Sequence, residues 1–417
     1  MTSRLIKSAM FIAALLTITK SAEAGFAYYA SDRTAGSVYW LEDLNGDGDA
    51  LDTNEKRLWA DGFSTVVELE KDGFDLYAVE EGLLDGSNRV IRMRDLNNDG
   101  DALDVNERVV WADGLDEPRD IAHDGQGNWY VSELEEDRVW RLNDLNNDGD
   151  ALDVNERVLY ADGINGAHSL LPFGGDLLST AYFEGQIHRL ADLNNDGDAL
   201  DIGENTVVVD SVLNPLGLQA DRQGGLYFAS WSTDTVYHAK DNNADGDMLD
   251  VLEVLSYADD VFGGLNGPWG MTDYHAGGLL LADYLDGQVL RLNDANGDGD
   301  ALDVGDTYLF ADGFTLPVDL VSACGLRGDL NCDGFVGIAD LNIVLANWNQ
   351  NIPPGDPLAD PSGDGFVGID DLNEVLGNWN AGTPPGGASD IPEPGALVLI
   401  GIGSAAMLSR RSMIKPL

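Results

Sequence analysis

The sequence predicts a mainly β protein, a six-bladed β-propeller followed by a small α-helical domain. An acidic stretch such as DLNNDGDALDVNERVVWADG, which starts at Asp95, occurs six times, and neighbouring copies start 48 to 53 residues apart. Each period also contains short runs that alternate Val, Tyr, Trp or Leu with polar residues and are bounded by Gly, Asp or Asn. Four strands in a period of this length are typical of a propeller blade, whereas helical repeats would show a 3.6-residue period.

The first 24 residues have the pattern of a cleaved secretory signal peptide. Arg4 and Lys7 precede an apolar run, and the small-residue sequence AEA follows at 22–24. A buried first helix is the alternative interpretation. We favour the signal peptide because the alternating strand pattern begins directly afterwards, at Phe26. Residues 25–323 then form the predicted propeller.

The end of the chain carries a second sorting pattern. Residues 392–417 start with the letters PEP, continue with an apolar run at 395–408, and contain a basic pair, Arg410 and Arg411. This order resembles the PEP-CTERM sorting signal of exported bacterial proteins. The resemblance implies transient inner-membrane anchoring by a transmembrane helix, cleavage by an exosortase-type enzyme, and a final location at the cell envelope, at the cell surface or outside the cell. A plain membrane anchor is the alternative, although the run is shorter than the roughly 20 residues of a stable span.

The charge of the chain restricts its partners. The formal net charge is −51, and 30 of the 74 acidic residues lie in the six acidic loops, five in each. Such a chain is repelled by nucleic acid and by anionic lipid surfaces, so we expect neither as a partner. Cations are the partners that this charge favours.

The order of strands predicts how the ring closes. The chain begins with three strands of a unit, FAYYASD, SVYWLED and KRLWADG, and the repeat block ends with a single strand, PVDLVSA, at 317–323. We expect this last strand to complete the first blade, because one-plus-three closure removes an open sheet edge. The inner-strand pattern, as in PRDIAHDGQGNWYVSE, resembles six-bladed propellers of the NHL and gluconolactonase-like superfamily, which implies the fold only.

The acidic loops resemble calcium loops of the EF-hand kind. In the second copy Asp95, Asn97 and Asp99 occupy positions 1, 3 and 5, with Gly at 6 and further acids, Asp104 and Glu107, at 10 and 13. The second half is shifted by one residue from the twelve-residue template, and a strand follows in place of a helix. Oxygen ligands without His or Cys favour calcium over zinc or copper, and magnesium needs tighter octahedral geometry. The alternative is a solvated Asp/Asn turn without metal.

Five positions in each loop are predicted calcium ligands, and we expect the metal to be structural, because it would neutralise carboxylates crowded in one turn. These residues are Asp43, Asn45, Asp47, Asp52, Glu55, Asp95, Asn97, Asp99, Asp104, Glu107, Asp144, Asn146, Asp148, Asp153, Glu156, Asp192, Asn194, Asp196, Asp201, Glu204, Asp241, Asn243, Asp245, Asp250, Glu253, Asp294, Asn296, Asp298, Asp303 and Asp306.

Residues 326–381 contain a duplicated loop and amphipathic helix, GDLNCDGFVGIADLNIVLANWN and DPSGDGFVGIDDLNEVLGNWN, and 382–391 form a linker. The duplication resembles a type I dockerin, which implies two calcium ions and docking to a cohesin-like partner, typically for polysaccharide-degrading enzymes. Ile338-Ala339 and Ile369-Asp370 replace the hydroxyl residues of the clostridial pattern, so a structural calcium module without a partner stays open. The ligands that the resemblance implies are Asp329, Asn331, Asp333, Asp340, Asp360, Ser362, Asp364 and Asp371.

Apolar residues predict that the two helices pack against each other. Those residues are Leu341, Val344, Leu345 and Trp348 in the first half and Leu372, Val375, Leu376 and Trp379 in the second. The only two cysteines, Cys324 and Cys332, form a disulfide in an oxidising compartment unless the metal loop constrains Cys332, and the sequence leaves both possibilities open.

Aligning the inner strands of the blades places six residues at one position of the central channel: Asp319, Glu68, Asp120, Ser169, Gly217 and Gly270. The three carboxylates, Glu68, Asp120 and Asp319, are candidates for holding a cation or for acid–base catalysis, with His168 one residue before its channel position. The alternative is that they only line a wet channel. No nucleophile motif or phosphate-binding loop is present.

We therefore expect an exported calcium-binding propeller that acts as a non-catalytic binding or interaction module at the cell envelope or in the extracellular matrix. Its expected partners are calcium ions, a cohesin-like protein and extracellular polysaccharide. The alternative is a dockerin-attached hydrolase of O-glycosyl or lactone bonds in polysaccharide catabolism. Trp231 and Trp269 are candidates for stacking on sugars, although Trp in propeller strands more often belongs to the core.

Overall fold

The computed structural model describes most of the predicted propeller and parts of the C-terminal module. The signal peptide, the linker and the PEP-CTERM tail lie outside the described residues, as do both cysteines and five predicted ligands of the module, Asn331, Asp333, Asp360, Ser362 and Asp364. The described residues are 27–82, 86–97, 99–125, 127–221, 224–261, 263–274, 277–323, 328–330, 336–350, 359, 361 and 366–381.

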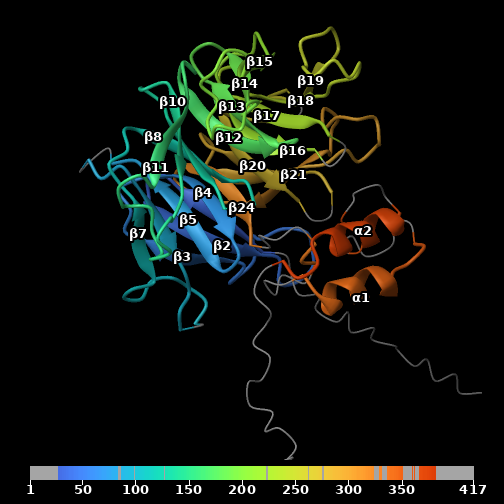
Figure 1. Ribbon diagram of the computed structural model, residues 1–417. Coiled ribbons are helices and arrows are strands. Elements are labelled where there is room, and N and C mark those ends of the chain that lie inside the picture. The colour runs from blue at the N-terminus through green and yellow to red at the C-terminus, as the bar shows by residue number, and fades with distance from the viewer. Residues whose placement is uncertain are drawn as a thin grey trace, which may run out of the picture.

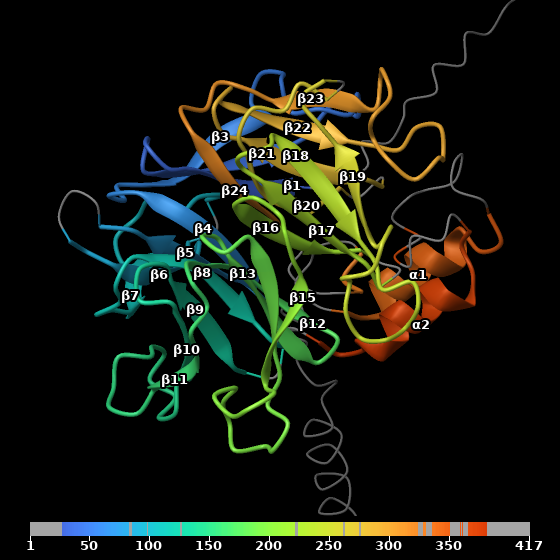
Figure 2. The ribbon, with the colours of Figure 1, turned by 90° about the horizontal axis from the view of Figure 1, so that it is seen from above.

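Six four-stranded antiparallel sheets surround a common axis, which confirms the predicted six-bladed propeller (Figure 1; Figure 2). The strands are given from the inner to the outer edge of each sheet. Blade 1 has β24 (Pro317–Ser322), β1 (Ala27–Asp32), β2 (Ser37–Glu42) and β3 (Lys56–Asp61); blade 2 has β4 (Val66–Asp72), β5 (Asp75–Glu80), β6 (Arg89–Met93) and β7 (Arg108–Ala112); blade 3 has β8 (Pro118–His123), β9 (Trp129–Glu133), β10 (Arg138–Leu142) and β11 (Arg157–Asp162).

The other three blades repeat this order. Blade 4 has β12 (Ala167–Phe173), β13 (Asp176–Ala181), β14 (Gln186–Leu190) and β15 (Asn205–Val209); blade 5 has β16 (Pro215–Ala220), β17 (Leu226–Ser230), β18 (Thr235–Ala239) and β19 (Val254–Ala258); blade 6 has β20 (Pro268–Asp273), β21 (Leu279–Asp283), β22 (Gln288–Leu292) and β23 (Thr307–Ala311). In each blade the acidic loop connects the third strand to the fourth.

The ring closes as the sequence predicted. The last strand, β24, pairs antiparallel with β1, with Tyr29 opposite Val321 and Ala30 opposite Leu320. The strand from the end of the repeat block thus becomes the inner strand of the first blade. Its backbone groups are hydrogen-bonded within a sheet, where an open ring would leave the β1 edge unpaired.

The hydrophobic core lies between neighbouring sheets. One cluster joins Tyr29, Val38 and Trp59 of blade 1 to Leu69 and Leu76 of blade 2, and all five side chains are buried. The rings of Tyr29 and Trp59 meet edge to face with their centroids 4.7 Å apart. Because each sheet is packed on both faces, every blade depends on two neighbours.

The two helices lie side by side, apart from the strands of the ring (Figure 1). Helix α1 (Ile338–Ala346) and helix α2 (Ile369–Gly377) begin after glycines whose backbone N–H groups bond to carboxylates three residues later. The Gly337 N–H donates to Asp340 Oδ2 at 2.7 Å, and the Gly368 N–H donates to Asp371 Oδ2 at 2.6 Å. The two halves of the duplication therefore start their helices in the same way.

The predicted packing of the helices was correct only in part. Val344 and Val375 are fully buried, and Leu341 and Leu372 pack against them. The prediction was wrong for Leu345, Trp348, Leu376 and Trp379, which are exposed to between 38% and 50%. Two nine-residue helices touch along a narrow line: Leu345 lies about 100° around the helix from Val344, and Trp348 lies beyond the last residue of α1.

Among the described residues, no helix has both the length and the apolar character needed to cross a membrane. The predicted transmembrane segment lies in the tail, outside the described residues.

We expect Leu320→Ala to reduce the free energy of unfolding by about 2–5 kcal/mol, because the change leaves a cavity beside the strand that closes the ring. Leu320 is 3% exposed. Leu309→Ala is the matched control, since the same side chain on outer strand β23 is 38% exposed. Urea unfolding of both variants measures the difference, and equal losses would contradict a special dependence on the closing strand.

Candidate functional site

The inner strands surround a channel of about 140 Å³, and the structure places all six aligned residues in its wall. The channel residues predicted from the sequence are therefore confirmed as neighbours in space. Strands β24, β4 and β8 contribute the three carboxylates, Asp319, Glu68 and Asp120. Strands β12, β16 and β20 contribute Ser169, Gly217 and Gly270.

The polar channel residues connect the inner strands of neighbouring blades. Asp319 Oδ2 accepts the backbone N–H of Leu69 at 3.1 Å, and Asp120 Oδ2 accepts that of Leu170 at 2.7 Å. Ser169 Oγ accepts the N–H of Gly217 at 2.9 Å. Each bond crosses from one blade to the next, so these side chains hold the ring together in addition to lining the channel.

Burial raises the pKa of the channel carboxyl groups. The pKa of Glu68 lies well above its usual value because of desolvation and of the nearby charges of Asp120 and Asp319. Desolvation likewise raises the pKa of Asp120 and of Asp319, and Glu68 and Asp319 share a side-chain hydrogen bond. Asp120 and Asp319 are buried, whereas Glu68 keeps partial exposure to the channel.

Glu70 is a channel carboxylate that the sequence reasoning missed. Desolvation, followed by the charge of Asp319, raises its pKa to about 8. Its sequence signal was its position two residues after Glu68, because alternate residues of a strand point to the same face.

A charged cluster lies at the end of the ring where the inner strands begin. Arg33 and Arg119 both bond to Glu81 Oε2, at 2.5 and 2.8 Å. The Arg33 guanidinium carbon is 5.8 Å from the centroid of the Trp269 ring, and the His168 ring is 5.7 Å from it. Arg33, Glu81, Arg119, His168 and Trp269 come from blades 1, 2, 3, 4 and 6, in that order, so they meet across the channel mouth. We call this set the mouth cluster.

The surroundings of His168 favour its neutral form. It is 5% exposed, and burial, together with the charges of Arg119 and Arg33, lowers its pKa well below the usual value. A neutral imidazole can donate one hydrogen bond and accept another without adding charge beside the two arginines. The sequence had placed His168 beside the channel, and its neighbourhood with Arg33 became apparent only from the fold.

Aromatic side chains extend the mouth cluster outward. The Trp231 ring is 5.5 Å from that of Trp269, and the Tyr284 ring is 5.1 Å from Trp269. Trp231 and Trp269 are partly buried and pack against the core of blades 5 and 6. The packing agrees with the core alternative from the sequence, and stacking on sugars stays a prediction.

The acidic loops divide their predicted ligands between two roles, as the third loop shows. The side-chain amide of Asn146 lies between Asp148 Oδ2, at 2.9 Å, and Asp153 Oδ2, at 2.6 Å. The Asp144 carboxylate accepts two backbone N–H groups of the turn. Glu156 is 2% exposed and accepts the N–H groups of positions 2 and 10. Positions 3, 5 and 10 therefore converge, while positions 1 and 13 shape the backbone.

The amide of position 3 lies between the carboxylates of positions 5 and 10 in all six loops. These groups are solvent-exposed oxygen donors of the kind that a hard cation prefers. Within the described ranges, no set of three or more His, Cys, Asp or Glu side chains is arranged as a metal site. The convergence in each loop consists of two carboxylates and one amide.

Each acidic loop also docks on the preceding blade. In the third loop the backbone N–H of Ala151 donates to the carbonyl of Trp111 in β7 at 2.7 Å. The other five loops make the same bond from position 8, and the first loop does so across the ring closure, from Ala50 to Phe310 at 2.7 Å. The sequence reasoning missed this contact. Its signal was the small residue at position 8, Ala in five loops and Met248 in the other.

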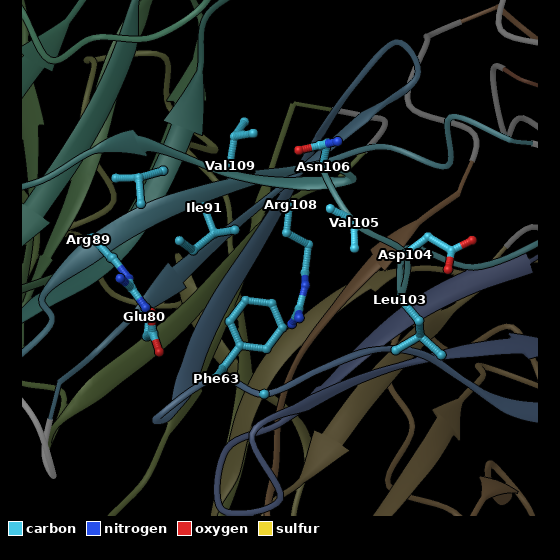
Figure 3. A pocket seen from close by; sticks show the side chains of 12 residues that line it. Phe63, Glu80, Arg89, Ile91, Leu103, Asp104, Val105, Asn106, Arg108 and Val109 are labelled. Atoms are coloured by element: carbon cyan, nitrogen blue, oxygen red, sulfur yellow. The ribbon is translucent and has the colours of Figure 1, made fainter.

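A surface pocket of about 400 Å³ lies where the second loop meets blade 1 (Figure 3). The Arg108 guanidinium is 5.5 Å from the centroid of the Phe63 ring, and Arg89 Nε bonds to Glu80 at 2.5 Å. Figure 3 shows the Asp104 carboxylate pointing away from Arg108. The pocket therefore belongs to the contact between loop and blade and is separate from the channel.

Three predicted ligands of the C-terminal module are described. Asp340 is fully buried and bonds to the N–H groups of Leu330 and Gly337, at 2.8 and 2.7 Å. Asp371 is equally buried, and Asp329 is 5% exposed. Asp340 and Asp371 tie the end of each loop to its helix.

Residues 390–412 match the PEP-CTERM protein-sorting motif. The chain therefore carries an export and envelope-sorting signal, which implies processing by an exosortase-type enzyme. This confirms the resemblance seen in the tail. None of the curated proteins compared with the chain matches it significantly.

Several solved structures are similar to this chain over its propeller. A chain of a nidogen–laminin complex is 16% identical, with a TM-score of 0.52, and the match covers 72% of this chain and 99% of that chain. An inactive virginiamycin B lyase of Staphylococcus aureus with quinupristin is 13% identical, with a TM-score of 0.40, and the match covers 70% of this chain and 86% of that chain. An auxiliary nutrient binding protein of Bacteroides ovatus is 12% identical, with a TM-score of 0.42, and the match covers 61% of this chain and 67% of that chain. The likeness to the nidogen–laminin chain agrees with the propeller fold and assigns no ligand.

We expect Glu70→Gln to reduce the loss of stability on raising the pH from 4.5 to 8. The folded protein holds the Glu70 proton up to about pH 8, whereas the unfolded chain releases it near 4.5. Between pH 4.5 and 8 the Glu70 carboxyl group therefore takes up a proton when the chain folds. Because of this uptake, the contribution of Glu70 to the free energy of unfolding falls as the pH rises. In urea unfolding, the free energy of unfolding of the variant should equal that of the wild type near pH 4.5 and be larger than that of the wild type at pH 8.

Glu184→Gln serves as the control, because Glu184 is an exposed carboxylate on the surface of blade 4. If Glu70→Gln and Glu184→Gln showed the same pH dependence, the raised pKa of Glu70 would be wrong.

Proposed function

We propose that this chain is an exported calcium-binding propeller that acts as a binding module at the cell envelope or in the extracellular matrix. The observation that carries the calcium proposal is the convergence of positions 3, 5 and 10 in all six acidic loops. The sorting motif supports an envelope location. In the proposal, the metal replaces the amide hydrogens as the partner of the two carboxylates, and the amide turns its oxygen inward.

Calcium would act on the whole ring through these loops. Each loop bonds to the preceding blade through its position-8 N–H, so ordering a loop also fixes an interface between blades. At free calcium ten times the dissociation constant, each site would add about 1.4 kcal/mol to the free energy of unfolding. Six such sites together are of the order of the total stability of an ordinary domain.

We also propose that residues 326–381 form a dockerin-like calcium module that joins the propeller to a protein partner. The equal capping of both helices by Asp340 and Asp371 supports a duplicated loop–helix unit. Ile338, Leu345 and Trp348 of the first half are exposed, as are their counterparts in the second half. These apolar side chains are where a cohesin-like partner would bind.

The alternative function is hydrolysis of glycosidic or lactone bonds by the channel carboxylates. The raised pKa of Glu68 suits a general acid, which is the observation in its favour. Asp120 and Asp319, however, already accept backbone N–H groups and connect blades. This structural use of two candidates makes us favour binding over catalysis.

We expect calcium to raise the melting temperature and a chelator to lower it, since bound cations remove the repulsion between crowded carboxylates. Replacing Asp148 and Asp153 together by Asn should lower the calcium stoichiometry by one in isothermal titration calorimetry. Asp150→Asn is the matched control in the same loop, because Asp150 bonds to the Leu152 N–H and lies outside the convergence. A melting temperature that does not change when the chelator is added would refute the calcium proposal.

We expect the purified protein to show no calcium-dependent hydrolysis on a panel of glycans and lactones, because its channel carboxylates serve as contacts between blades. The measurement is product release over time for the wild type and for Asp120→Ala. Turnover by the wild type that disappears in a folded Asp120→Ala variant would favour the hydrolase instead.

A further inference from the structure

Helix α2 has an apolar stripe that the described residues leave open to solvent. Its members, Ile369, Leu372, Leu376 and Trp379, recur at intervals of three and four residues, which is the spacing of one helix face. Leu372 is partly buried, whereas Ile369, Leu376 and Trp379 are 58%, 48% and 38% exposed. Val375, in contrast, is fully buried in the core of the module. We call these four residues the α2 stripe. It is a second apolar face of the helix, beside the face that packs on α1.

Helix α1 carries the same stripe with less charge around it. The members there are Ile338, Leu341, Leu345 and Trp348. The only acid of α1 is Asp340, which is fully buried, whereas α2 contains three acids. One of them, Asp370, is exposed next to Ile369, and its counterpart in α1 is Ala339. The α2 stripe therefore suits an apolar segment that carries positive charge.

The tail of the same chain has this chemistry. The run at 395–408 is largely aliphatic and contains no charged residue. Its fourteen residues are fewer than the roughly 20 of a stable membrane span, so a protein surface would help to shield it from water. Arg410 and Arg411 follow directly, and they are the first basic residues after Arg327. An apolar run with a basic end complements an apolar stripe beside an exposed carboxylate.

The chain between stripe and tail is long enough for contact within one molecule. The described residues end at Ala381, two residues after the stripe, and the tail run begins at Gly395. The thirteen residues at 382–394 can span up to about 45 Å, whereas the stripe is only about 15 Å long from Ile369 to Trp379. A tether of this length holds the run near the stripe at an effective concentration on the order of millimolar. This favours the molecule's own tail over a second copy of the chain.

We propose that the tail run at 395–408, until it is removed, lies on the α2 stripe of its own molecule, with the Arg410–Arg411 pair beside Asp370. The inference rests on the proposed docking role of the module and names a regulation of that surface. The attached tail covers the apolar side chains of the second half, and cleavage by the exosortase-type enzyme uncovers them. The α1 stripe stays open in both forms.

The test is photo-crosslinking of the full chain, purified in calcium with its tail intact and without detergent. The photoreactive residue p-benzoylphenylalanine takes the place of Leu376, whose partial exposure leaves room for it. We expect a crosslink within one molecule to residues 395–408, located by mass spectrometry of peptides. The same label in place of Leu345, the counterpart on α1, should give at least about tenfold less of this product, because the tether favours one stripe.

Two further variants test the charge contact. Asp370→Ala gives α2 the residue that α1 has and should lower the crosslink yield about two- to fivefold, the worth of one exposed ion pair. Glu374→Gln is the matched control, since at 100° per residue Glu374 lies on the side of α2 opposite the stripe. This control should crosslink like the wild type.

Crosslinks between molecules, equal yields from the labels at positions 376 and 345, or no crosslink to residues 395–408 would overturn the inference. The docking role of the module is measured separately, by binding of a cohesin domain to the full chain and to a chain that ends at Ile391. Tighter binding to the shorter chain is the result that we expect. Binding to neither chain, with the crosslink present, would refute the docking role and leave the tail contact standing.

Discussion

The pairing of β24 with β1 is the interaction on which the rest of the structure depends. Each sheet buries both faces against its neighbours, so an open ring would expose apolar faces at two blades and a free edge at β1. The closing strand also brings Asp319 into the channel wall, where it bonds to Leu69 of blade 2. Outside the sheets, the first acidic loop crosses the same junction through the bond from Ala50 to Phe310.

Because the strands of each blade are antiparallel, the mouth cluster and the acidic loops lie at opposite ends of the ring. The first residues of the inner strands and the residues after the second strands meet at one end, which explains why Arg119, His168 and Trp269 come together with Arg33 and Glu81. The acidic loops leave the opposite end, between the third and fourth strands. Elements that stabilise the ring are thus separated from the channel mouth, which can vary in sequence at little cost to the blades.

Polar groups in the channel have a structural cost and a structural use. Burial raises the pKa of Glu68, Asp120 and Asp319, so keeping them charged is unfavourable at neutral pH. Asp120 and Asp319 offset part of this cost by accepting backbone N–H groups of the next blade. At Gly217, a Cβ atom would lie 2.2 Å from the Trp269 carbonyl oxygen, so the strands leave no room for a side chain. The wall is therefore acidic on one side and bare on the other.

The sequence by itself determined the six blades, the one-plus-three closure and the aligned channel residues, because these follow from a repeat period and from alternation within strands. The tertiary structure decided which of the repeated acids converge. Glu156 and Asp153 look equivalent as acids in the sequence, yet one is buried against backbone N–H groups and the other faces Asn146. The mouth cluster likewise depends on the fold, since Arg33 and Trp269 are far apart in the chain and meet only because the ring closes.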